Sequence, residues 1–194
     1  MLTLPQRTSK PRTVGLTAIH DVHLTSGQCK NILKDYNCFL DVAKFGVGTA
    51  YIAPNLEEKI RLYKDSQVEP YFGGSLFEKF YMQKKLEEYL EFLEEHNIKT
   101  LEVSTGTVDI SIDDRVELVS RLSKNYNVLT EVGSKDAETI MSPTTWVTEI
   151  NALLEAGANY VITEGRNSGT AGIYRPSGEM REGLVEEIAT NCDT

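Results

Sequence analysis

The sequence has few cysteines, little proline, a single tryptophan and no long hydrophobic run. Its three cysteines, Cys29, Cys38 and Cys192, show no Cys-x-x-Cys spacing and are too few for a disulfide framework. We therefore expect free thiols in a reducing compartment. No stretch approaches the length of a membrane span, and residues 1–12 lack the apolar core of a secretion signal. These absences predict a cytoplasmic protein that does not enter a membrane.

Positive charge is scarce as well. Lysine and arginine number 20 against 29 aspartates and glutamates, which gives a formal net charge of −9 and a pI of about 4.9. This balance argues against a non-specific nucleic-acid binder and against attraction to a membrane surface. An anionic substrate is still compatible with it. The site for such a substrate must be built locally, from a few cations and backbone N–H groups.

The sequence does contain a regular alternation of β-rich and helical segments. Between the β-rich runs, apolar residues recur at helical spacing, as at Leu86, Leu90 and Leu93. The runs repeat every ~30 residues, about the size of one βα unit. They are Thr13–Ile19, Asp41–Phe45, Val68–Phe72, Thr100–Val103, Asn127–Thr130 and Tyr160–Thr163. With no linker or low-complexity segment in between, residues 1–194 are predicted to form a single domain.

Several residues mark helix ends. Ser111 precedes Asp114 at the spacing of a capping box, and Asn55 is placed to cap the helix that follows it. Gly157 is predicted to close the helix that starts near Trp146.

Alternating strands and helices predict an α/β fold with a parallel sheet, either closed into a barrel or doubly wound. Regular spacing, and polar or glycine-rich residues after nearly every strand, favour a (β/α)8 TIM-type barrel, in which function gathers at the strand ends. Eight units typically take ~250 residues, whereas this chain ends just after its sixth predicted helix, Met180–Ala189. We therefore expect about six βα units, and either a truncated barrel that lacks the last two or an unusual closure.

The first predicted strand ends in His20-Asp21-Val22-His23. The two histidines lie at i and i+3 of an extended run, so their rings point to opposite faces and do not meet at one metal ion. Asp21 is instead predicted to lie on the active rim. The alternative, that Asp21 caps the next turn, has equal weight.

The second strand carries Lys44 within an apolar run. A lysine there is costly unless its ammonium finds a partner or a ligand. We expect Lys44 to bind an anionic substrate, with Gly46 and Gly48 allowing the backbone to approach that ligand closely. A buried structural ion pair is the alternative.

The later strand ends offer further anion-binding and acid–base groups. Gly74 and Ser75 begin a predicted helix, where backbone N–H groups form either an oxyanion cradle or a plain turn. Glu131 and Lys135 flank a glycine turn, so a carboxylate is available for a divalent metal and a lysine for proton transfer. Arg166 offers a planar fork for phosphate, carboxylate or sulfonate. The alternative for each charged residue is a surface ion pair.

The sequences at these strand ends resemble those of the phosphosulfolactate synthases. This family begins coenzyme M synthesis in methanogens and has relatives in spore-forming bacteria. The resemblance is collinear and covers almost the whole chain, with residues 71–78 and 131–136 the most specific. The matching stretches are 10–17, 42–49, 71–78, 102–107, 131–136 and 164–169.

The resemblance implies a carbon–sulfur lyase on a TIM-type barrel. Such an enzyme adds sulfite to phosphoenolpyruvate with Mg²⁺ and gives (2R)-phosphosulfolactate. The metal and the cations would stabilise the charge that forms on the substrate carboxylate. Lys135, with Glu131, would be catalytic, and Lys135 matches the lysine suited to deliver the proton. The implied substrate-binding residues are Lys44, Arg166, Gly74, Ser75 and Ser134, and the implied metal or water ligands are Asp21, Glu131 and Glu164.

Two other functions are compatible with the sequence. Plant heat-stress-associated relatives of this family act through protein partners rather than through catalysis, although the retained Glu131, Lys135 and Arg166 favour chemistry. Another phospho-carboxylate lyase on the same barrel is the third hypothesis, because fold does not fix substrate. For the synthase we expect small anionic substrates, no nucleic acid, no membrane and a homo-oligomer.

Overall fold

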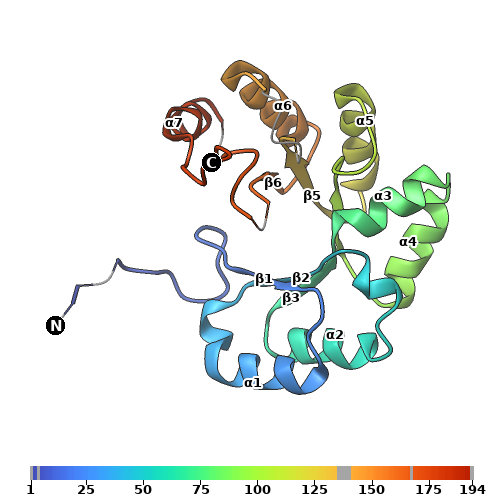
Figure 1. The fold of residues 1–194 in the computed structure, drawn as a ribbon. Helices are drawn as coiled ribbons and strands as arrows, with labels where there is room; N and C mark the ends of the chain where they lie inside the picture. The colour runs from blue at the N-terminus through green and yellow to red at the C-terminus, as the bar shows by residue number, and fades with distance from the viewer. Residues whose placement is uncertain (1, 4, 135–140, 167, 193–194) are drawn as a thin grey trace.

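The computed structural model describes residues 2–3, 5–134, 141–166 and 168–192. Six parallel strands form one sheet in chain order, and the sheet is curled with the helices on its outside (Figure 1). The strands are β1 (Ala18–Asp21), β2 (Val42–Phe45), β3 (Glu69–Phe72), β4 (Thr100–Val103), β5 (Asn127–Val132) and β6 (Tyr160–Thr163). The predicted α/β architecture is confirmed as a curled half-barrel of the TIM type, and a closed eight-stranded barrel is not seen in the described part of the chain.

Helices follow every strand, and two of them follow β3. They are α1 (Ser26–Tyr36), α2 (Leu56–Asp65), α3 (Gly74–Met82), α4 (Leu86–Glu95), α5 (Ile112–Leu122), α6 (Pro143–Glu155) and α7 (Glu182–Asn191), with short 3-10 turns η1 (Asn37–Phe39) and η2 (Thr49–Tyr51). Within the described ranges, none of these helices has the length and apolar character needed to cross a membrane.

Two of the three predicted helix ends are confirmed. Ser111 caps α5 by accepting a hydrogen bond from the Asp114 N–H, and Gly157 follows the end of α6 with a φ of 107°. Asn55 does occupy the N-cap position of α2, but its side chain makes no capping hydrogen bond. Its side-chain amide donates to the Ser26 hydroxyl at 2.7 Å, and so links α2 to α1 instead of capping its own helix.

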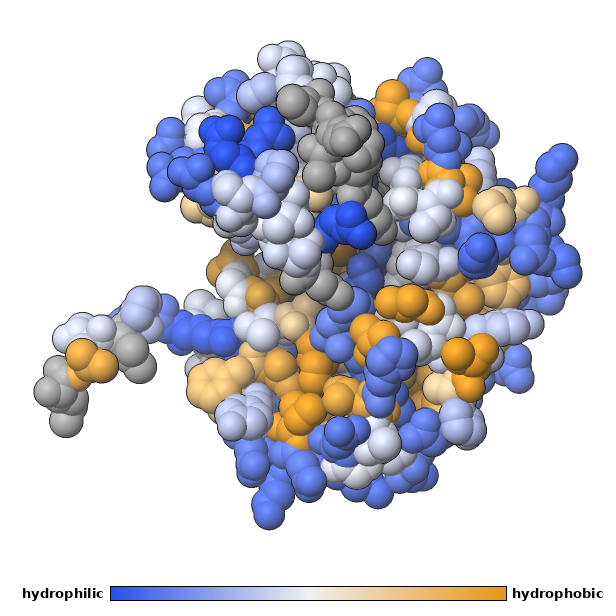
Figure 2. All heavy atoms as spheres, in the orientation of Figure 1, coloured by the Kyte–Doolittle hydropathy of each residue, from blue (hydrophilic) through white to orange (hydrophobic). Residues whose placement is uncertain are grey.

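Alternation along the strands sorts the side chains onto two faces. One set, which includes Phe45, Phe72, Leu101 and Val128, is buried between the sheet and the helices and forms the main core. The other set faces the concave interior of the half-barrel. In Figure 2 hydrophobic surface gathers in the middle of the face shown, around β1–β3, while the surrounding helices present hydrophilic residues.

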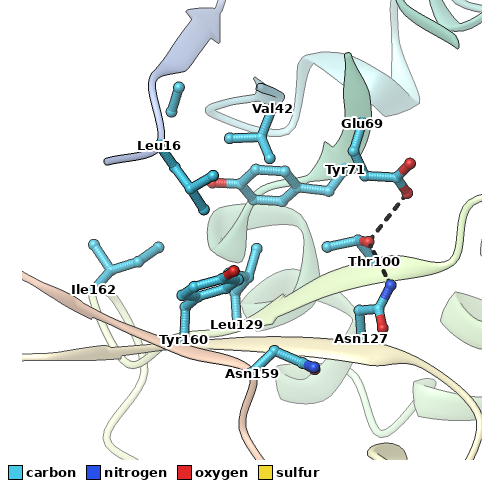
Figure 3. A pocket seen from close by; sticks show the side chains of 11 residues that line it. Leu16, Val42, Glu69, Tyr71, Thr100, Asn127, Leu129, Asn159, Tyr160 and Ile162 are labelled. Carbon is cyan, nitrogen blue, oxygen red and sulfur yellow. Dashed lines mark hydrogen bonds between the residues drawn. The ribbon is translucent and has the colours of Figure 1, made fainter. Parts of the chain in front are cut away.

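At the amino ends of the strands, the concave interior holds a largely apolar cavity of about 430 Å³ (Figure 3). Side chains of β2 and β3 face side chains of β5 and β6 across it. Its polar wall is internally hydrogen-bonded, because Thr100 donates to Glu69 at 3.1 Å and Asn127 donates to Thr100 at 3.4 Å. The lining residues are Leu16, Ala18, Val42, Glu69, Tyr71, Thr100, Asn127, Leu129, Asn159, Tyr160 and Ile162.

The first strand begins later than the sequence predicted, at Ala18 rather than Thr13. The preceding segment is held by Asp41 at the start of β2. The Asp41 carboxylate pairs with Arg12 at 2.6 Å and accepts the Thr17 N–H at 2.8 Å. The Tyr160 hydroxyl donates to the Thr13 carbonyl at 3.2 Å, and backbone pairing with the neighbouring strand is limited to the Thr17 carbonyl, which accepts the N–H groups of Asp41 and Val42.

A fully buried polar cluster lies between β1 and the helices α1 and α2. Asp21 pairs with Lys59 at 2.7 Å, accepts the Tyr63 hydroxyl at 2.9 Å and receives the Cys29 thiol at 3.6 Å. Both charged side chains are at most 3% exposed. Burial raises the pKa of the Cys29 thiol and of the Tyr63 phenol, so both groups stay protonated as donors.

The buried pair predicts a large effect when one partner is removed. Lys59→Met would leave the Asp21 carboxylate buried without its counter-charge, and we expect a loss of about 3–5 kcal/mol in the free energy of unfolding. Lys30→Met is the matched control, because Lys30 and Glu58 form an exposed pair whose loss should cost under about 1 kcal/mol. Urea unfolding of both variants checks this, and equal losses would contradict it.

Candidate active site

Polar side chains occupy the concave interior at the carboxyl ends of the strands, beyond the apolar cavity. On each strand they lie two residues beyond a residue that lines that cavity, and therefore on the same face. This polar layer consists of His20, Lys44, Glu102, Glu131 and Glu164, with Tyr71 between the layer and the cavity. The strand ends of a parallel barrel thus meet at one mouth, as the barrel architecture requires.

An ion pair between a residue of β2 and a residue of β4 lies at the centre of this layer. The Lys44 ammonium donates to the Glu102 carboxylate at 2.8 Å. The same Glu102 oxygen accepts the N–H of Gly74, the first residue of α3, at 2.9 Å. The side chain of Glu102 is 1% exposed and that of Lys44 is 24% exposed. Glu102 is therefore fixed by two donors, while Lys44 still reaches solvent at the mouth.

The glycines after β2 and β3 make room for side chains of this layer. A Cβ on Gly46 would collide with the ring of His20, and a Cβ on Gly73 would lie 2.8 Å from Cε of Lys44. Gly48, by contrast, turns the chain, with a φ of 71° and open space around it. Gly46 and Gly48 were expected to let the backbone approach a ligand closely. In the structure Gly46 instead makes room for the His20 ring, and Gly73 makes room for Lys44.

Two groups of the layer have shifted pKa values. Partial burial, and next the Lys44 ammonium, lower the pKa of His20, so its imidazole is neutral near pH 7. Burial, and then the charges of Glu102 and Glu131, raise the pKa of Tyr71, whose phenol therefore stays protonated. The mouth thus holds a neutral imidazole and a phenol donor beside the ion pair.

Glu131 lies on β5 and Glu164 directly follows β6, in the half of the sheet that faces β1–β3. Both carboxylates are buried, and the Arg166 N–H donates to Glu164 at 2.5 Å. Gly133 brings the ends of β5 and β6 together, because a Cβ there would lie 2.9 Å from Cβ of Glu164. Ser134 follows Gly133 and is half-buried. The structure therefore places Glu131, Ser134, Glu164 and Arg166 on adjoining strand ends, as expected.

The structure does not bring Asp21 to this group. Strand alternation turns His20 toward the mouth and Asp21 toward the helices, where Lys59 neutralises it. The alternative given to Asp21 is seen in part, since its carboxylate accepts the Leu24 N–H at 3.2 Å. Ser75 lies in the first turn of α3, beside the Gly74 N–H that Glu102 already occupies. Lys135 lies outside the described residues.

Sequence reasoning missed Glu102 and Tyr71 as members of the site. The alternation of side chains within each strand is the sequence feature that could have identified them. Glu102 lies two residues after Thr100, and Tyr71 two residues after Glu69, so each shares the inward face with those polar residues. An acidic residue in the middle of a four-residue buried strand is costly without a partner, and Lys44 on β2 supplies it.

The close approach at Gly74 generates a prediction. A Cβ at this position would meet the Ser104 hydroxyl and lie 2.6 Å from the Glu102 carboxylate. We expect Gly74→Ala to lower the free energy of unfolding by about 1–3 kcal/mol through overpacking. Gly183→Ala in α7 is the control, because nothing lies within 4 Å of that position and alanine there should be neutral or stabilising by up to ~1 kcal/mol. Thermal or urea unfolding distinguishes the two, and a neutral Gly74→Ala would contradict the packing argument.

The pKa of His20 can be measured directly. By NMR, His20 should titrate below its ordinary value of 6.5. Lys44→Met should raise this pKa, because it removes a repelling cation and leaves the Glu102 charge unopposed. Lys79→Met, on the exposed face of α3, should leave it unchanged. A His20 pKa that does not respond to loss of Lys44 would argue against the shared mouth.

Comparison with known proteins assigns this fold and site to a family. The sequence profile of the (2R)-phospho-3-sulfolactate synthase (ComA) family matches residues 5–194. A phosphosulfolactate synthase of Bacillus subtilis (strain 168) is 37% identical over 192 residues, which cover 98% of this chain and 76% of that protein. A phosphosulfolactate synthase of Methanothermobacter thermautotrophicus is 35% identical and is covered to 71% of its length.

Solved structures support the fold alone. A putative lyase/mutase from Burkholderia cenocepacia J2315 matches with a TM-score of 0.52 at 10% identity, over 90% of this chain and 66% of that one. CpGH84B matches with a TM-score of 0.55 at 12% identity, over 80% of this chain and 34% of that one. The match along residues 5–194 and the identity to the curated enzymes decide the assignment: this chain belongs to the phosphosulfolactate synthase family.

Proposed function

We propose that the protein adds sulfite to phosphoenolpyruvate to give (2R)-phosphosulfolactate. In this reaction the sulfite sulfur bonds to the methylene carbon, the carbon–carbon double bond opens, and a proton is added to the carbon that bears the phosphate. The observation that carries the proposal is the convergence at one mouth, beyond an apolar cavity, of charged side chains from four strand ends and of a neutral histidine from a fifth. Such a mouth suits a small, highly charged substrate and a reaction in which charge moves onto a carboxylate.

The cations of the mouth bind the substrate in this proposal. Lys44 has one open side toward solvent, and its ammonium has three donors, so it binds a substrate anion without leaving Glu102. Arg166 is exposed on the loop after β6 and offers a fork for phosphate or carboxylate. The phenol of Tyr71, kept protonated by its raised pKa, hydrogen-bonds to Glu102 from the cavity side and so helps to hold the ion pair in place.

Mg²⁺ is the proposed cofactor, and Glu131 and Glu164 are its proposed ligands. The donor set fits: two buried carboxylates on neighbouring strand ends suit a cation that usually takes one or two carboxylates together with water and substrate oxygens. No group of three or more histidine, cysteine, aspartate or glutamate ligands occurs among the residues that the structure describes, so the remaining ligands are assigned to solvent and substrate. Mg²⁺ would supply positive charge against the developing carboxylate charge.

Lys135 is the proposed proton donor. It follows β5 four residues after Glu131, and the sequence resemblance is its support, since it lies outside the described residues. Lysine suits this role because neighbouring cations and burial lower its pKa toward neutrality. In this assignment Glu131 and Glu164 would hold the cation, Lys44 and Arg166 hold the substrate, and Lys135 delivers the proton.

The experiment is a direct assay of the protein with phosphoenolpyruvate, sulfite and Mg²⁺. We expect a sulfonate product by mass spectrometry and ³¹P NMR, and loss of product with EDTA. Lys135→Ala should lower the rate by about 10²–10⁴-fold, the usual contribution of a general acid. Lys124→Ala, an exposed lysine after α5, is the matched control and should retain full activity.

The outcomes separate the proposal from its competitors. No product from folded wild-type protein, with phosphoenolpyruvate still raising its melting temperature, would point to another phospho-carboxylate reaction in the same mouth. Neither product nor a thermal shift with phosphoenolpyruvate, sulfite or sulfolactate would remove the catalytic assignment altogether.

A further inference from the structure

Glu78 is a buried carboxylate that no step of the proposed reaction uses. It lies on α3, one turn after Gly74, and is 0% exposed. Four donors from the loop between β4 and α5 converge on it. They are the Gly106 N–H at 2.8 Å, the Thr107 N–H at 2.7 Å, and the hydroxyls of Ser104 and Thr107 in short contacts.

These four donors all come from one loop and converge on a single carboxylate. An ionised carboxylate has about four lone-pair sites, and hydrogen bonds to a charged acceptor are about twice as strong as neutral ones. The two N–H donors are fixed by the backbone of Gly106 and Thr107, so they cannot turn to another partner. Glu78 therefore ties the first turns of α3 to the end of β4.

The same junction holds the central ion pair. Ser104 lies directly against Gly74, where a Cβ would collide with its hydroxyl, and the Gly74 N–H is bound to Glu102. Glu102 in turn holds the Lys44 ammonium. Glu78, Ser104, Gly74, Glu102 and Lys44 thus form one continuous set of contacts, from a side chain outside the mouth to the cation within it.

We propose that Glu78 is a positioning residue that sets the geometry of the Lys44–Glu102 pair by docking the start of α3 onto the end of β4. The inference rests on the proposed function only in giving Lys44 a substrate to bind. The contacts themselves do not depend on that function. Glu78 touches neither substrate nor metal in this assignment.

Glu78→Gln is the informative substitution because it keeps the shape and changes the pattern of donors and acceptors. The glutamine oxygen still accepts from Ser104 and Gly106. Its NH₂ group, however, faces the N–H of Thr107, and two donors repel each other. The Thr107 hydroxyl can rotate to accept, but its N–H cannot. We expect the loop to separate from α3, and the Gly74–Glu102 contact to loosen with it.

The readout is the Lys44 ammonium itself, observed by NMR of ¹⁵N-lysine-labelled protein and assigned with Lys44→Arg. In Glu78→Gln the Lys44 Nζ signal should shift, and its protons should exchange with water several-fold faster. Asp41→Asn is the matched control. It removes another buried carboxylate, which directly precedes β2 and so lies at the opposite end of that strand from Lys44, and should leave the signal in place.

Thr107→Val provides a milder variant if Glu78→Gln does not fold, because it removes one donor at an exposed residue. It should shift the Lys44 signal in the same direction by less. An unchanged Lys44 signal in a folded Glu78 or Thr107 variant would overturn the inference, as would an equal shift in Asp41→Asn. Because no substrate is present, either result leaves the proposed synthase activity to its own assay.

Discussion

The Lys44–Glu102 pair is the constraint on which the mouth of the half-barrel depends. The Glu102 carboxylate is almost fully buried, and the loss of its hydration costs several kcal/mol, which pairing with Lys44 and hydrogen bonding must offset. Their pairing joins β2 to β4 across β3. The carboxylate needs a further donor, and the Gly74 N–H supplies it only because α3 begins directly against β4. The glycines after β3 are thus explained by the ion pair.

Much of the fold was predictable from the sequence, because each strand is a short apolar run followed by polar or glycine-rich residues. The ranges of β2, β4 and β6 match the prediction closely. The first strand was placed too early, since residues 13–17 have strand-like composition but only the Thr17 carbonyl pairs with the backbone at the start of β2. Asp41, distant in sequence, takes the Thr17 N–H. No local pattern reveals that competition.

The position of a side chain was predictable where one residue decided the outcome: Lys44, Glu131 and Glu164 lie at the strand ends, and Lys44 forms the ion pair that was the alternative to substrate binding. The site was not predictable where either of two adjacent polar residues could face the mouth. His20 and Asp21 are both polar and adjacent, and only the phase of the strand decides which of them faces the mouth. Long-range partners were hidden as well. Glu78 lies on a helix and its four donors lie 26–29 residues later, on the loop after β4.

Charge at the mouth explains why a divalent cation belongs in the proposed reaction. Among the described residues, Lys44 and Arg166 bring two positive charges, while Glu102, Glu131 and Glu164 bring three negative ones. Lys135 would only balance the count. A substrate with a phosphate and a carboxylate, approached by sulfite, would therefore meet no net attraction.

A divalent ion between Glu131 and Glu164 would reverse the local sign and is often the largest charge in such a site. The apolar cavity below sharpens this effect, because charges beside a low-dielectric region are poorly screened. The two halves of the interior thus act together. The apolar floor strengthens the interactions of each charge, and in the proposed reaction the surplus of carboxylates at the mouth would make the cation a requirement for binding.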